Sequence, residues 1–128
     1  MNKLAISISI VLSALLIGGV VLMGSQSSGG ASGVATVVDG KQFIDITAKG
    51  GYSPRVVTAK AGMPTVLRVQ TNGTFDCSAS LVIPKLSYQK FLQSSGTEEI
   101  IISPEAAQGT MKGLCSMGMY SFEIDFQS

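Results

Sequence analysis

Histidine is absent from this 128-residue chain, and only two cysteines are present. Because histidine is the commonest general base and the commonest ligand of zinc and Cu(II), its absence excludes most catalytic and metal sites built on imidazole. A blue-copper centre needs two histidines and one cysteine and is therefore excluded outright. An iron–sulfur cluster normally uses four cysteines, and a structural zinc site four thiolate, imidazole or carboxylate ligands, so two cysteines argue against both.

Charge is also sparse, with nine Lys and Arg residues against eight Asp and Glu residues. No block of one sign occurs, so the chain lacks the basic surface typical of nucleic-acid binding. Ser116 has no neighbouring base to activate it as a nucleophile, and Glu98 and Glu99 are expected to face opposite sides of a strand. We therefore expect no enzymatic activity, no small-molecule substrate and no nucleic-acid partner.

Residues 4–23 form a run without any charged residue. Twenty residues at helical rise span about 30 Å, the thickness of the hydrocarbon core of a bilayer. The run exceeds the apolar region of a usual secretory signal, no clear cleavage site follows it, and a lipoprotein anchor is excluded because no cysteine follows it. An uncleaved anchor is thus favoured over a cleaved signal. We predict a transmembrane anchor over residues 1–23, a flexible Gly/Ser linker over 24–33 and a folded domain over 34–128.

Beyond residue 34 the chain is rich in β-branched residues and alternating patterns broken by Gly and Pro. The clearest alternation runs through the last segment, where Tyr120, Phe122, Ile124 and Phe126 alternate with polar residues. One helix of about two turns is predicted over residues 85–93. Many short strands with frequent turn signals predict an all-β sandwich or small barrel. The predicted strands are 34–39, 42–48, 56–58, 65–71, 78–83, 98–102, 110–114 and 120–126.

Three sulfur side chains lie within the five residues that join the last two predicted strands. Gly118, between two of them, allows a tight turn. Cys77 lies in another loop after a strand, and because loops gather at the two ends of a sandwich, the two cysteines can meet at one end. Thiolate and thioether sulfur are soft ligands that select Cu(I). We predict a Cu(I) site formed by Cys77, Cys115, Met117 and Met119.

A structural disulfide is the competing interpretation of the two cysteines. It would close a loop of about 39 residues and stabilise the fold by roughly 4 kcal/mol. Composition alone favours neither the disulfide nor the metal site. A disulfide does not require Met117 and Met119 beside it, which favours the metal site, although methionines also fill cores. Met63 and Met111 are expected to be core residues.

Several short segments of the chain together form a recognisable pattern over about residues 50–126. They are Gly51-Tyr52-Ser53-Pro54, Val56-Val57, Ala61-Gly62, Cys77, Val82-Ile83-Pro84 and Cys115-Ser116-Met117-Gly118-Met119. This pattern resembles a bacterial cupredoxin-like domain. Within that group the chain resembles the membrane-anchored Cu(I) chaperones of streptococci, including their N-terminal helix and polar tether. The Cys-x-Met-x-Met end with a single upstream cysteine is the more specific part of the resemblance.

The resemblance implies a Greek-key β-sandwich with a binuclear Cu(I) cluster. Cys77 and Cys115 would form the tighter site as two thiolates, and Met117 and Met119 would hold a second, weaker ion with Cys115 bridging the pair. Such a protein would act without catalysis and pass Cu(I) to a copper-exporting P-type ATPase, giving copper resistance. It would face the cytoplasm, where thiols stay reduced, although Lys3 favours the opposite orientation. An extracellular, disulfide-locked binding or structural module is the alternative.

Overall fold

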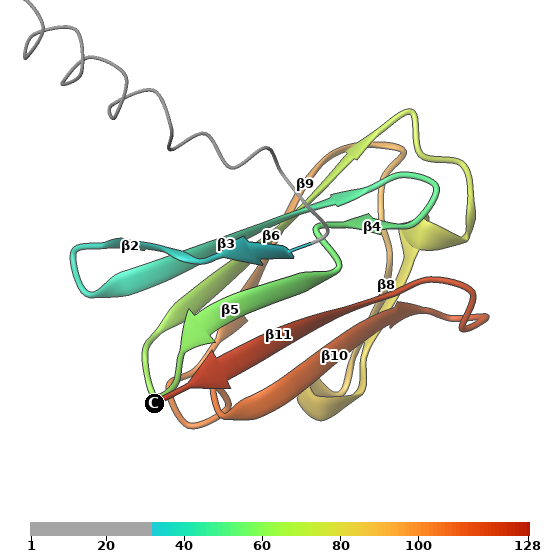
Figure 1. The fold of residues 1–128 in the computed structure, drawn as a ribbon. Helices are drawn as coiled ribbons and strands as arrows, with labels where there is room; N and C mark the ends of the chain where they lie inside the picture. The colour runs from blue at the N-terminus through green and yellow to red at the C-terminus, as the bar shows by residue number, and fades with distance from the viewer. Residues whose placement is uncertain (1–31) are drawn as a thin grey trace, which may run out of the picture.

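Two β-sheets form the domain in the computed structural model, which describes residues 32–128 (Figure 1). The larger sheet has the strand order β1-β5-β11-β10-β7-β8, and the smaller has the order β2-β3-β6-β9 with β4 paired to β3. The larger sheet comprises β1 (Ser32–Val34), β5 (Val56–Lys60), β11 (Ser121–Gln127), β10 (Gly109–Cys115), β7 (Ser80–Ile83) and β8 (Tyr88–Phe91). The smaller comprises β2 (Thr36–Val38), β3 (Lys41–Ala48), β6 (Thr65–Asn72), β9 (Ser95–Ile102) and β4 (Tyr52–Ser53). This all-β sandwich agrees with the fold class predicted from the sequence.

The core forms where the inward-facing residues of the two sheets meet. In β11, Phe122, Ile124 and Phe126 are buried while their neighbours on the strand are more exposed, as the alternation predicted. In β3 the same period buries Gln42, Ile44, Ile46 and Ala48. Met111 is fully buried, which confirms it as a core residue, whereas Met63 is only half-buried. Because successive side chains of a strand point to opposite faces, this period also fixes which face of each strand meets the core.

Close packing between β10 and β11 depends on a glycine. Gly113 lies opposite Phe122 in the antiparallel pair, and a Cβ atom at position 113 would collide with the Phe122 ring. The same ring makes an edge-to-face contact with Tyr52, with ring centroids 5.1 Å apart. Tyr52 is thereby held in the core close to the end of the sandwich that contains the two cysteines.

The predicted helix over residues 85–93 is wrong. Pro84–Leu86 makes only a single 3₁₀ turn, η2, and Ser87 then adopts a left-handed φ of 50° that no helix can continue through. The chain goes on as β8, which pairs antiparallel with β7 from Ser80↔Phe91 to Ile83↔Tyr88. The segment has three apolar residues at mixed spacing, Leu86, Phe91 and Leu92, and periodicity over so short a segment does not separate a helix from a strand.

Other predicted strands differ in detail from the observed ones. The first predicted strand is two short strands, β1 and β2, that belong to different sheets, and the segment 78–83 begins as a 3₁₀ turn, η1 (Cys77–Ala79). β1 also includes Ser32 and Gly33, which the sequence analysis assigned to the linker. The predicted anchor over residues 1–23 lies outside the described residues. Within residues 32–128, no helix has the length and hydrophobicity needed to cross a bilayer.

Candidate metal centre

Cys115 is the last residue of β10, and its side chain is fully buried. The chain then turns back towards β11 through a tight turn, in which the Gly118 backbone N–H donates to the Cys115 carbonyl oxygen at 2.8 Å. Gly118 has a φ of 72°, a left-handed conformation that glycine adopts without strain. The Cys115 N–H in turn donates to the Tyr120 carbonyl oxygen at 3.0 Å, which closes the hairpin. The turn therefore holds Ser116, Met117 and Met119 at the end of the sandwich.

Cys77 reaches the same end from the loop that follows β6. It begins the turn η1, where the Ala79 N–H donates to the Asp76 carbonyl oxygen at 3.2 Å. The Ser78 hydroxyl donates to the Asp76 carboxylate at 2.5 Å. This hydrogen bond, joined by backbone N–H groups of Gly50 and Ser78, lowers the pKa of Asp76. Local hydrogen bonds thus define the backbone around Cys77.

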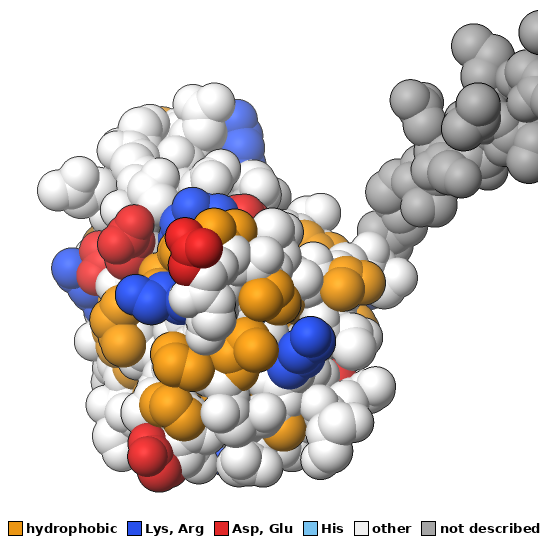
Figure 2. All heavy atoms as spheres, turned by 90° about the vertical axis from the view of Figure 1, so that its left-hand side faces the viewer, with side chains coloured by type: hydrophobic (Ala, Val, Ile, Leu, Met, Phe, Trp, Pro, Cys, Tyr) orange, Lys and Arg blue, Asp and Glu red, His pale blue; other side chains and the backbone are white. Residues whose placement is uncertain are grey.

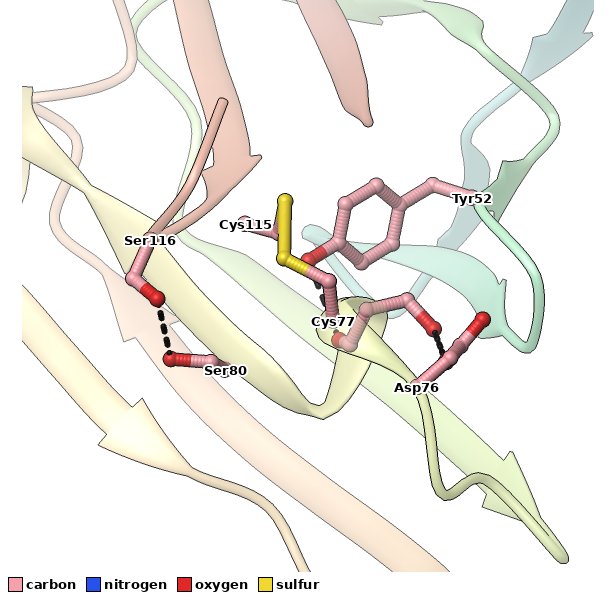
Figure 3. The surroundings of a disulfide bond; sticks show 7 residues. Tyr52, Asp76, Cys77, Ser80, Cys115 and Ser116 are labelled. Atoms are coloured by element: carbon pink, nitrogen blue, oxygen red, sulfur yellow. Dashed lines mark hydrogen bonds between the residues drawn. A yellow bond between two sulfur atoms is a disulfide. The ribbon is translucent and has the colours of Figure 1, made fainter. Parts of the chain in front are cut away.

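The structure brings the two cysteines together in a disulfide bond, with their Cα atoms 5.7 Å apart (Figure 3). The loop after β6 and the end of β10 meet as expected for loops at one end of a sandwich, and no free cysteine occurs in residues 32–128. A hydrogen bond of 2.8 Å from the Ser80 hydroxyl to the Ser116 hydroxyl lies beside the pair. The disulfide is the competing interpretation that the sequence left open. Two thiolates that share one soft ion also require Cys77 and Cys115 to lie this close together.

Met117 and Met119 contrast with the buried Cys115, because they are 77% and 65% exposed. Methionines that only fill a core are buried, as Met111 is, so core filling does not explain these two. In the part of the chain that the structure describes, no group of three or more His, Cys, Asp or Glu side chains could hold a metal ion. The sulfur-rich end of the domain therefore offers two adjacent cysteines, half-buried and buried, and two exposed thioethers on one turn.

A scan against protein-family models matches residues 14–124 to the cupredoxin-like domain. The chain belongs to this family. No curated protein sequence gives a significant match.

Two solved structures share the fold of this cupredoxin-like domain. One is the solution structure of a copper-binding protein in the apo form, with 24% sequence identity and a TM-score of 0.68, covering 77% of this chain and all of that one (100%). The other is the Cu(I)-bound metal-binding domain of the Cu(I)-exporting P-type ATPase CopA of Streptococcus pneumoniae D39, with 18% identity and a TM-score of 0.67. The second match covers 76% of this chain and 96% of that one. At these identities the likeness establishes a common fold.

Tyr52 is a residue of this end of the cupredoxin-like domain to which the sequence analysis gave no role. Its hydroxyl donates to the Ser78 carbonyl oxygen at 3.0 Å, so it ties η1, which begins at Cys77, to the core (Figure 3). Burial, joined by the negative charge of Asp76, raises the pKa of Tyr52 to about 12. The sequence carried no sign of this role, because the acceptor is a main-chain atom 26 residues away.

Replacing Tyr52 by Phe in the cupredoxin-like domain is expected to lower the free energy of unfolding by about 1 kcal/mol, since it removes one buried hydrogen bond. It should also change the pH dependence. The tyrosine of the unfolded chain ionises near pH 10, whereas Tyr52 in the folded domain keeps its proton up to about pH 12. The wild-type domain therefore has the full contribution of Tyr52 below pH 10 and loses it between pH 10 and pH 12.

Urea unfolding at pH 7, 10 and 11.5 measures this effect. The wild type should lose more stability on going to alkaline pH than Tyr52→Phe does. Tyr88, whose pKa burial and the charge of Glu98 also raise to about 12, is retained in both proteins, so its own alkaline titration cancels when their pH profiles are compared. Parallel pH profiles of stability for the wild type and Tyr52→Phe would show that folding does not raise the pKa of Tyr52.

Proposed function

We propose that this domain binds Cu(I) through Cys77, Cys115, Met117 and Met119 and passes it to a copper-exporting P-type ATPase. The observation that carries the proposal is the meeting of the two cysteines at the end of the sandwich whose turn bears the two exposed methionines. All four side chains offer sulfur, the donor that Cu(I) prefers. Copper is the cargo of the protein in this proposal, and no catalytic step is involved.

Cys77 and Cys115, when reduced, supply two thiolates for a tighter ion, and Met117 and Met119 supply neutral thioethers for a weaker one, with Cys115 bridging. Thiolates carry charge and thioethers do not, so the methionine ion leaves first. Transfer proceeds by ligand exchange, in which a sulfur of the partner attacks the bound ion and one domain ligand departs. The exposure of Met117 and Met119 supports this route, because a partner can approach them from solvent.

The choice of partner draws on a shared fold. A metal-binding domain of a Cu(I)-exporting P-type ATPase has the same sandwich architecture and was solved with Cu(I). In the proposal, residues 1–23 anchor the chain in the cell membrane as a single span and residues 24–33 form the tether. Anchoring raises the local concentration of the domain beside a membrane-embedded exporter. The domain faces the cytoplasm, where thiols are kept reduced and available to Cu(I).

The disulfide favours a second candidate function, an extracellular module locked by Cys77–Cys115 that binds or organises another protein. An electron-transfer cupredoxin is excluded, because the chain has no histidine to complete a blue-copper centre. A count of reactive thiols on freshly isolated protein separates the first two functions. The chaperone yields two reactive thiols per chain, whereas the locked module yields none.

An anaerobic Cu(I) titration tests the proposal directly. The full chain, solubilised in detergent and fully reduced, competes with a chromophoric Cu(I) chelator. We expect the protein to withdraw up to two Cu(I) ions from the chelator. A folded, reduced protein that withdraws none would overturn copper binding and leave the disulfide-locked module as the better account.

A further inference from the structure

An apolar groove opens at the end of the sandwich opposite the cysteines. It has a volume of about 670 Å³ and lies where β1 and β2 run beside the end of β5, the start of β6 and the end of β11. Figure 2 views the molecule from the side on which the β2–β3 turn and the C-terminus lie, and hydrophobic side chains gather on that face. Most of the groove lining is apolar and includes Val34, Ala35, Val37, Ala61, Met63 and Pro64.

The strands beside the groove expose several valine side chains to solvent. Val34 is 81% exposed, Val37 42% and Val38 50%, and no residue of β2 is buried. Single exposed valines are ordinary, but Val34 and Val37 both line the apolar groove and form with it a patch of the kind that meets a partner or a membrane. We call Val34, Val37 and the groove the apolar end.

The floor of the groove is fixed by a buried glutamine. Gln42, fully buried, donates through Nε2 to the Lys60 carbonyl oxygen at 2.7 Å and to the Thr65 hydroxyl at 2.9 Å, and it accepts from the Lys60 N–H at 3.0 Å. These bonds join β3, β5 and β6 across the two sheets. The groove is therefore a preformed feature of the fold. In residues 32–128 no buried side-chain nitrogen or oxygen lacks a hydrogen-bond partner, so the groove offers no such atom to a small polar ligand.

Two lysines flank the apolar end. Lys60 lines the groove and Lys41 follows Gly40 in the β2–β3 turn, and both are exposed. Asp39 is the acidic residue in the same turn, so lysine is in excess there. Apolar side chains flanked by lysine match a bilayer surface, where the valines reach the acyl boundary and the ammonium groups meet anionic headgroups.

We propose that the apolar end docks on the surface of the membrane that holds residues 4–23, an inference that rests on the anchor in the proposed function. Residues 24–31 separate the anchor from Ser32, and eight extended residues reach up to about 28 Å. Val37 lies five residues beyond Ser32 along β1 and β2, or about 17 Å at strand rise. The tether is thus long enough for the apolar end to reach the bilayer.

Docking in this way orients the metal centre. β11 begins at Ser121, beside the turn with Met117 and Met119, and ends at Gln127, which lines the groove. Seven strand residues separate the two ends by roughly 20 Å. With the apolar end on the bilayer, the four sulfur ligands face away from the membrane, towards the soluble parts of a partner.

A single-tryptophan experiment tests the docking, since the chain contains no tryptophan. Val37→Trp places the reporter at the apolar end, and Phe91→Trp is the matched control. Phe91 is 78% exposed and pairs with Ser80, at the sulfur end. Both full-length variants are reconstituted into vesicles of phosphatidylcholine and phosphatidylglycerol, with or without acyl chains that carry a doxyl quencher.

We expect doxyl lipid to quench the fluorescence at position 37 at least twofold and to leave position 91 unquenched. Quenching at neither position, or equal quenching at both, would overturn docking by the apolar end. Absence of quenching together with a concentration-dependent dimer would assign the apolar end to a second copy instead. If Val37→Trp misfolds, Val34→Trp takes its place. Adding Val34→Asp to the Val37→Trp protein should reduce the quenching at position 37.

Two controls separate this inference from the proposed function. Flotation of the vesicles reports whether the full chain is anchored. A chain that does not float with the vesicles would overturn both the anchor and the docking. A Cu(I) titration of the same vesicles reports the metal centre. Two bound ions without quenching at position 37 would leave the chaperone function standing and overturn only the docking.

Discussion

Replacing Cys115 by Ala is expected to abolish the binding of both Cu(I) ions by the reduced protein. Cys115 is the proposed ligand common to the two sites, and the structure sets it directly beside Cys77 and two residues before Met117. Its loss leaves one thiolate and two neutral thioethers, a set without the pair of charged sulfurs that holds the tighter ion. The chelator competition that detects two ions in the wild type should then detect none.

The paired replacement of Met117 and Met119 by Ala is the matched comparison. Both side chains are largely exposed, so their removal should leave the fold unchanged, and the variant should keep the tighter ion while losing the weaker one. Cys115 is fully buried, so its variant is first checked for cooperative unfolding under reducing conditions. If the double methionine variant lost both ions equally, or if Cys115→Ala kept one, the proposed sharing of ligands would be wrong.

How far the sequence predicted the arrangement of the candidate metal centre depends on the kind of contact involved. The approach of Cys77 to Cys115 followed from the rule that sandwich loops cluster at two ends, and the structure confirms that the two loops meet. The clustering of Met117 and Met119 beside Cys115 needed only local spacing. Tyr52 was missed because it acts through the backbone of Ser78, and main-chain acceptors leave no pattern in a sequence.

The fold shows the same division between periodic and non-periodic signals. The strict alternation of β11 identified its buried face, because apolar and polar residues alternate along a strand that lies between the core and solvent. The segment of η2 and β8 was assigned to a helix because three apolar residues at mixed spacing fit either structure. The pairing of β8 with β7 and the left-handed backbone of Ser87 make this segment a turn and a strand. The division of the first strand between two sheets is likewise set by pairing, which alternation alone does not encode.

Oxidation of Cys77 and Cys115 is expected to remove both Cu(I) sites, because Cys115 is a ligand of each. A disulfide has no thiolate, and the thiolate is the form that binds a metal. Formation of the bond releases two protons and two electrons to an oxidant such as diamide, and reduction by a thiol or phosphine reverses it. Chelator competition should therefore show two ions for the reduced chain and none for the oxidised chain, because the oxidised chain also lacks the Cys115 thiolate that both sites share.

Stability should change in the opposite direction. The bond joins residues 38 apart, and in the chain-entropy model it stabilises the apo domain by about 4 kcal/mol relative to the reduced form. Cu(I) bound by the reduced pair should restore much of that stability, because a ligand that binds only the folded state stabilises it by mass action. Urea unfolding of the oxidised apo, reduced apo and reduced Cu(I)-loaded protein measures the three states.

Cys77→Ser is the control, because it cannot form the disulfide and should respond to neither oxidant nor reductant in stability. A thiol count before each titration fixes the redox state of the sample. If the fully oxidised chain withdrew Cu(I) as well as the reduced chain, the cysteines would not be the ligands, and their pairing would be structural alone. If the oxidised chain binds no Cu(I) and the reduced chain binds two ions, the disulfide and the copper centre are alternative states of the same pair, and the redox environment decides which one the domain adopts.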